Sequence, residues 1–148
     1  MIKQISIKTK FGWISAFEQN GKIYKVKFGK CKNISASNNL KKFKSSLNNF
    51  LTKKTKLLQF NILIKGNPVQ KKIWNELKKI KFGQTKSYGS IAKKYKLSPR
   101  YVGKICGQNK IPLAIPCHRV IKSDGSLGGF SARGGIVLKK KLLDFEKN

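Results

Sequence analysis

The sequence predicts an α/β N-terminal subdomain, built from a small antiparallel sheet and a helix, followed by a mainly helical C-terminal domain. Three observations carry this prediction. Apolar and polar residues alternate within residues 2–29, which is typical of strands. Apolar residues recur at helical spacing over 38–53 and again from residue 69 onward. Gly66-Asn-Pro68 is a turn signal between these parts, so we predict domains at 1–64 and 65–148.

The N-terminal subdomain is predicted to contain three strands before its helix. Apolar and polar residues alternate over 5–7 and 24–28, and a short aromatic and β-branched run at 13–17 lies between them. Asn20-Gly21 is a favoured two-residue turn between antiparallel strands. Residues 60–64 are predicted to form a further strand or an extended connector.

The C-terminal domain is predicted to contain four helices, at residues 69–80, 87–96, 100–107 and 138–146. The second and third are separated by the sharp turn Leu97-Ser-Pro99, which is the outline of a winged-helix-like helix-turn-helix. The apolar run at 111–116 contains two prolines, so we expect it to be extended and outside any regular sheet.

The composition is strongly basic. Lys and Arg number 34 against five Asp and Glu, which gives a formal net charge of +29. Such a charge indicates a polyanionic partner, of which nucleic acid is the commonest. Only three of the basic residues are arginine, however, and an A·T-rich coding bias explains an excess of lysine equally well.

Other compositional features exclude several classes of protein. The apolar runs are too short for a membrane span, and the first residues do not resemble a signal peptide, so we expect a cytoplasmic location and no membrane partner. Three scattered cysteines are too few for a disulfide framework or a four-ligand zinc site, and no metal is expected.

Cys117 and the adjacent His118 are the best candidates for a nucleophile and its base. An imidazole that takes the proton of a thiol makes it a strong nucleophile. Because neighbours on an extended chain point to opposite sides, the two must meet at a turn or through a water. A carboxylate best orients the imidazole, and Glu146 in the last helix is a candidate. The alternative is an inert buried cysteine beside a surface histidine.

Several motifs occur in order over residues 66–146. They are Gly-Asn-Pro-Val-Gln-Lys-Lys-Ile-Trp at 66–74, Gly-Gln-Thr-Lys-Ser-Tyr-Gly at 83–89, Arg-Tyr-Val-Gly at 100–103, Asn109, Ile-Pro-Cys-His-Arg-Val at 115–120, Gly-Phe at 129–130, and Lys139 through Leu142-Leu143 to Glu146. Together they resemble the signature blocks of the O6-alkylguanine-DNA alkyltransferases, also called methylated-DNA–protein-cysteine methyltransferases. Residues 1–60 fit that family's N-terminal subdomain in size and strand pattern but carry no specific signal.

This resemblance implies direct, irreversible and stoichiometric transfer of an alkyl (methyl) group from O6-alkylguanine in double-stranded DNA to Cys117. It implies no external cofactor and a helix-turn-helix that docks in the minor groove. The damaged base must leave the helical stack, because its O6 atom is otherwise out of reach. We expect a monomer.

The resemblance also assigns roles to individual residues. His118 is the implied base, acting through a water and oriented by Glu146. Tyr88 is implied to protonate or hydrogen-bond the purine so that guanine leaves neutral. Arg100, at the start of its helix, is implied to fill the gap left by the flipped base.

The remaining matched positions have supporting roles. Tyr101, where the family has a small alanine, and Gly103 are implied to face the DNA. Asn109 is implied to brace the turn that leads to Cys117, and Arg119 to make an ion pair or bind a carbonyl. The implied pocket residues are Ser131, which contacts the guanine, and Phe130, which replaces a frequent tyrosine.

Three alternative functions are left open by parts of the sequence. A non-catalytic alkyltransferase-like protein that binds DNA lesions would share the fold, but relatives of that kind lack the acceptor cysteine. A helix-turn-helix regulator explains the charge and residues 87–107 but leaves 116–120 without a role. A cysteine hydrolase explains Cys117 and His118 but not the arginine and tyrosine motifs.

Overall fold

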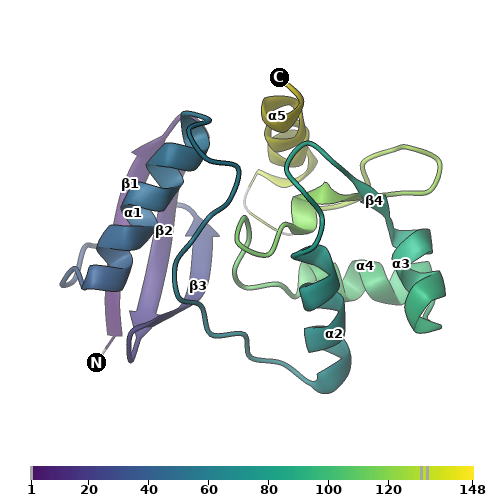
Figure 1. Ribbon diagram of the computed structural model, residues 1–148, viewed down its shortest axis with the longest axis horizontal. Helices are drawn as coiled ribbons and strands as arrows, with labels where there is room; N and C mark the ends of the chain where they lie inside the picture. The colour runs from purple at the N-terminus through teal and green to yellow at the C-terminus, as the bar shows by residue number, and fades with distance from the viewer. Residues whose placement is uncertain (1, 131, 133) are drawn as a thin grey trace. The chain divides into compact units, whose positions relative to one another are not determined.

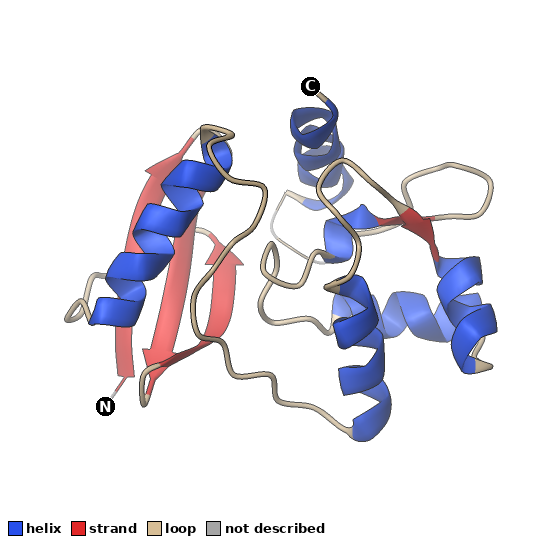
Figure 2. Cartoon of the chain, viewed as in Figure 1, coloured by secondary structure: helices blue, strands red, loops and turns tan. Residues whose placement is uncertain are grey.

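The structure is a computed structural model that describes residues 2–130, 132 and 134–148. The chain divides into two compact units, Met1–Lys65 and Gly66–Asn148. Figure 1 follows the chain through both units, and Figure 2 shows that their secondary structure differs. The first contains a sheet and one helix, whereas the second is mainly helical.

The first unit is a three-stranded antiparallel sheet in the order β1-β2-β3, as predicted. Its strands are β1 (Ile2–Thr9), β2 (Gly12–Gln19) and β3 (Lys22–Phe28). The turn between β2 and β3 is made by Asn20 (φ 53°) and Gly21 (φ 77°), both in the left-handed region that the Asn-Gly sequence favours. Residues 60–64 form an extended connector, in which Ile62 makes a single bridge to Ile23.

The helix α1 (Asn38–Leu51) covers one face of this sheet (Figure 1). Alternate strand residues such as Ile14, Ala16 and Val26 are buried on the sheet, and the buried stripe of α1 includes Leu40 and Phe43. Burial of these apolar side chains is the main stabilising contribution in this unit.

The second unit begins with α2 (Pro68–Leu77), whose buried face includes Trp74 and Glu76. The Trp74 indole donates a hydrogen bond to the carbonyl oxygen of Ile105 (3.0 Å). Burial alone would raise the pKa of Glu76, but hydrogen bonds from Lys94, Tyr95 and Lys86 lower it to about 2. As a carboxylate, Glu76 therefore ties α2 to Lys86 and to the end of the next helix, where Lys94 and Tyr95 lie.

The helix-turn-helix consists of α3 (Tyr88–Tyr95) and α4 (Pro99–Gly107). Lys96 ends α3 in the left-handed conformation (φ 57°), and Ser98 caps α4 by accepting a hydrogen bond from the backbone N–H of Tyr101 (3.1 Å). A short parallel pairing of β4 (Lys86–Ser87) with β5 (Val120–Ile121) lies beside it. The predicted fold class is confirmed.

Three local predictions in the second unit are wrong. The helix predicted over 69–80 ends at Leu77, although Ile80 is still buried and so continues the apolar spacing of the sequence. The run at 111–116 is not extended, because Leu113 has φ 74° and the N–H of Ile115 donates to the carbonyl oxygen of Ile111 (3.0 Å), which makes a turn. The last helix, α5 (Gly135–Lys147), begins three residues before the predicted start. Its first turn presents Ile136 and Val137 to solvent, so the apolar periodicity of the sequence does not mark it. No helix in the described ranges is long and apolar enough to cross a membrane.

Candidate active site

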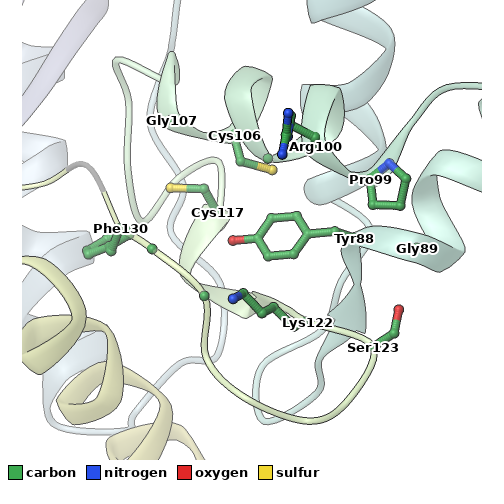
Figure 3. A pocket seen from close by; sticks show the side chains of 13 residues that line it. Tyr88, Gly89, Pro99, Arg100, Cys106, Gly107, Cys117, Lys122, Ser123 and Phe130 are labelled. Carbon is green, nitrogen blue, oxygen red and sulfur yellow. The ribbon is translucent and has the colours of Figure 1, made fainter.

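A cavity of about 610 Å³ lies in the second unit, beside the helix-turn-helix. Its walls come from α3, α4, the segment after β5 and the 3-10 turn η1 (Cys117–Arg119). The lining residues are Tyr88, Gly89, Pro99, Arg100, Gly103, Cys106, Gly107, Cys117, Lys122, Ser123, Gly128, Gly129 and Phe130. Figure 3 shows the side chains of Cys106, Cys117 and Tyr88 around this space.

The acceptor candidate Cys117 is held by the turn that precedes it. Its backbone N–H donates to the carbonyl oxygen of Ile115 (2.8 Å), which also accepts a hydrogen bond from the Asn109 amide (2.8 Å). The oxygen of the same amide accepts from the N–H of Ile111 (2.9 Å). Asn109 thus adds two side-chain hydrogen bonds to the backbone bonds of this turn, and the following 3-10 turn carries Cys117 and His118 together.

His118 is completely buried and lies against the last helix. Its Nε2 is 2.7 Å from Oε2 of Glu146. Arg119 binds the same carboxylate through Nε (2.7 Å) and Nη2 (2.9 Å), and donates from Nη1 to the carbonyl oxygen of Ile80 (2.7 Å). Arg119 therefore makes both an ion pair and a carbonyl contact. These three residues form a buried His118–Glu146–Arg119 cluster.

The protonation of this cluster follows from its surroundings. Burial alone would raise the pKa of Glu146, but hydrogen bonds from His118 and Arg119 lower it to about 2. Burial lowers the pKa of His118, although Glu146 opposes this shift. A neutral imidazole that faces a carboxylate through Nε2 carries its proton there, so Nδ1 is left with a lone pair. Nδ1 is buried and has no hydrogen-bond partner among the described residues, so it can accept a proton.

Lys139 is the least expected member of the site. Its side chain is completely buried on α5, and Nζ donates to the Tyr88 hydroxyl (3.1 Å) and to the carbonyl oxygen of Gly129 (3.1 Å). Burial lowers the pKa of Lys139 to about 8, although the nearby thiols oppose this. Burial also raises the pKa of Cys117, whereas a hydrogen bond from Asn109 and the positive charge of Lys139 lower it. Lys139 therefore favours the thiolate.

Tyr88 stands at the first residue of α3 and keeps its proton. Burial, reinforced by Cys106 and Cys117, raises its pKa to about 12. Gly128 has φ 72°, and a Cβ there would lie 3.0 Å from Cε2 of the Tyr88 ring. A larger residue at position 128 would displace this ring.

Comparisons with known proteins show to which family the chain belongs. Residues 68–148 match the family model described as the DNA-binding domain of 6-O-methylguanine DNA methyltransferase. The methylated-DNA–protein-cysteine methyltransferase of Metallosphaera sedula is 36% identical over 149 residues, which cover 99% of this chain and 94% of the relative. The chain belongs to the methylated-DNA–protein-cysteine methyltransferase family. The predicted membership of a family of DNA-binding repair methyltransferases is thereby confirmed.

Further relatives of this methyltransferase family differ in how much of each chain is aligned. The enzyme of Methanocaldococcus vulcanius is 54% identical over 77 residues, so the match spans 52% of this chain and about half (46%) of that relative. The structure of Mycobacterium tuberculosis O6-methylguanine methyltransferase superposes with a TM-score of 0.87 at 26% identity, over 99% of this chain and 93% of the other. Mycobacterium tuberculosis OGT in complex with DNA gives 0.85 at 25% identity, over 97% and 92%.

Some of the residues predicted from the methyltransferase resemblance line the cavity, and others do not. Arg100 is exposed. It lines the cavity together with Gly103 and Phe130. Tyr101, 38% exposed, is on the same helix but is not part of the cavity wall. The predicted contact of Ser131 lies outside the described residues. Within the described part of the chain, no three His, Cys, Asp or Glu side chains are grouped as a metal site would require.

Several site residues were missed by sequence reasoning, and three of them have titratable side chains. Cys106 has the inward-facing helical position of a core residue, yet its buried side chain also lines the cavity. Lys122 lines the cavity but no motif marks it. Lys139 did carry a signal, because it shares the buried stripe of α5 with Leu142 and Glu146, where a lysine needs a specific partner.

Proposed function

We propose that this chain repairs O6-alkylguanine in duplex DNA by transferring the alkyl group to Sγ of its own Cys117. One observation carries the proposal. A thiol on a cavity wall shares a 3-10 turn with a buried histidine whose Nε2 is bound by a carboxylate and whose Nδ1 can accept a proton. Because the product is a stable thioether, each molecule reacts once.

The transfer breaks the bond between the alkyl carbon and O6 and forms a bond from that carbon to Sγ of Cys117. His118 takes the thiol proton at Nδ1 through a water, and the Glu146 carboxylate at 2.7 Å stabilises the imidazolium. Burial raises the pKa of Cys117, but a hydrogen bond from Asn109 and the positive charge of Lys139 lower it and so offset part of the cost of forming a buried thiolate. The nucleophile is therefore generated where the substrate binds.

The leaving guanine needs a proton, which Tyr88 provides to the purine ring. Its hydroxyl lines the cavity and accepts a hydrogen bond from Lys139 (3.1 Å), which stabilises negative charge on the phenol oxygen as the proton leaves. The pKa of about 12 supports a group that stays protonated until the reaction. No external cofactor is required by these steps.

Helix α4 is the element we assign to the DNA minor groove. Arg100 is exposed at its second residue and also lines the cavity, which supports entry of its side chain into the gap left by a flipped base. Tyr101 and Gly103 follow on the same helix and would face the groove. The flipped base would then occupy the cavity.

The test of the proposed function is incubation with duplex DNA that carries O6-methylguanine, followed by intact-mass measurement. We expect one methyl adduct per protein molecule, located at Cys117 by peptide mapping. A non-catalytic lesion-binding protein, the second candidate, would bind this DNA and show no adduct. The acceptor thiol on the cavity wall favours transfer over mere binding.

Arg100→Ala is expected to slow repair of duplex DNA about tenfold, while its reaction with free O6-benzylguanine stays nearly unchanged. Base flipping costs a few kcal/mol, and a side chain that fills the gap offsets part of this cost. Loss of roughly 1.4 kcal/mol of the offset slows the reaction about tenfold. Rates on both substrates are measured with one preparation, and equal losses would contradict the assigned role.

Lys139→Met is expected to raise the pKa of the Cys117 thiol, because it removes a nearby cation. Since Lys139 itself loses its charge above a pKa of about 8, the wild type should react faster than the variant below about pH 8, and the difference should shrink above it. The measurement is the rate of Cys117 alkylation by iodoacetamide against pH.

Lys141→Met, at an exposed position on the same helix, is the matched control and should follow the wild-type profile. If the ratio of the wild-type alkylation rate to that of Lys139→Met stays constant with pH, the charge of Lys139 does not act on the Cys117 thiol.

A further inference from the structure

The N-terminal unit has an unusual surface charge. Residues 1–65 contain fifteen lysines and one acidic residue, Glu18. Glu18 is 3% exposed and accepts a hydrogen bond from the Ser37 hydroxyl, so its carboxylate is not part of the surface. The described surface of this unit therefore presents cations with no exposed carboxylate. This unit lies outside residues 68–148, which match the DNA-binding domain of the family.

A groove of about 660 Å³ gathers some of these cations. It runs between β1 and α1, and we call it the β1–α1 groove. Its polar and aromatic lining residues are Ser6, Lys8, Trp13, Asn33, Lys41, Lys44 and Asn48. Lys41, Lys44 and Asn48 are spaced to share one face of α1, whereas Lys8 comes from the strand. Cations thus reach the groove from both of its walls.

The three lysines of the groove have no acidic partner among the described residues. In the part of the chain that the structure describes, no salt bridge involves Lys8, Lys41 or Lys44, and all three are exposed. A further cation is adjacent, because Nζ of Lys30 lies 4.7 Å from the centre of the Trp13 ring. Like charges around one groove repel one another, so a bound anion would be stabilised by all of them.

We propose that the β1–α1 groove binds phosphates of the DNA backbone, so that the N-terminal unit makes its own contact with DNA, independent of the lesion. The uniform sign of the whole unit favours an extended polyanion over a single small anion, since the field attracts phosphates beyond those in the groove. The choice of DNA as that polyanion rests on the proposed function. Lysine contacts to phosphate carry no sequence information, so this contact is non-specific.

The experiment uses the full chain and undamaged duplex DNA. Lys8→Gln/Lys41→Gln/Lys44→Gln removes the groove lysines, and Lys22→Gln/Lys42→Gln/Lys54→Gln removes three exposed lysines of the same unit outside the groove. The dissociation constant is measured at several salt concentrations for both variants and the wild type. The slope of log K against log salt is negative, and each lost phosphate contact reduces its magnitude by about 0.9.

We expect the groove variant to reduce the magnitude of the slope by about 2 to 3 and the control variant to reduce it by less than about 1. Equal changes in both variants, or an unchanged slope in the groove variant, would overturn the proposal. A second measurement needs no variant. Lys8, Lys41 and Lys44 of the wild type should be protected by DNA from an amine-reactive ester, and Lys22, Lys42 and Lys54 should not. Absence of this protection would also overturn the proposal that the groove binds DNA.

The two proposals fail in different ways. If the chain does not transfer methyl groups, the intact-mass experiment shows no adduct while the salt dependence on undamaged DNA is unaffected. If the groove does not bind DNA, the groove variant keeps the wild-type slope while the methyl adduct at Cys117 still forms.

Discussion

Cys117→Ala is expected to abolish methyl transfer completely and to leave DNA binding unchanged. In the proposed reaction the thiolate forms the new bond to the alkyl carbon, whereas DNA docking is assigned to exposed residues of α4 and to the β1–α1 groove. The measurements are intact mass after incubation with O6-methylguanine DNA and a gel-shift titration with the same DNA. An adduct on the variant would show that the nucleophile is wrongly assigned.

Cys106→Ala is the matched control, because Cys106 is also buried and also lines the cavity. Burial, together with a smaller effect of the neighbouring Cys117, raises the pKa of Cys106 to about 12. Cys106 therefore stays a thiol and is a poor nucleophile. We expect this variant to form the adduct in wild-type yield. Loss of the adduct would mean that the two thiols act together.

Glu146→Gln is expected to lower the free energy of unfolding by about 3–5 kcal/mol, because it leaves the buried guanidinium of Arg119 without its counter-charge. It should also slow methyl transfer, since a neutral amide stabilises the His118 imidazolium less well. Urea denaturation measures the first effect. Asp144→Asn, which breaks an exposed pair with Lys140 on the same helix, should cost less than about 0.5 kcal/mol. Equal costs for the two variants would contradict a stabilising cluster.

The same variant should change the response to acid. The pKa of Glu146 is lowered from its ordinary 4.5 to about 2, so its contribution to stability is complete above about pH 4.5 and is lost as pH falls towards 2. Glu76 has a similarly low pKa and remains in the variant. Stability of Glu146→Gln should therefore fall less steeply in this range than that of the wild type, without becoming independent of pH.

Much of the fold could be predicted from the sequence because its signals are local. The Asn20-Gly21 turn, the alternation in β3 and the cap and proline at the start of α4 act within a few residues, where backbone preference and burial reinforce each other. The candidates Cys117, His118 and Glu146 could be named from adjacency and from motifs in order. Their roles stay predictions until the variants are measured.

Tertiary structure alone decided which groups meet and in which charge state. Glu146 receives hydrogen bonds from residues 27 and 28 positions earlier, and Arg119 reaches the Ile80 carbonyl 39 positions away. The turn at 111–115 is held in part by the Asn109 side chain, and Lys139 has a lowered pKa because α5 buries it against Tyr88. No short pattern encodes these contacts. Desolvation and pairing act through space, and both depend on the packing of segments that are distant in sequence.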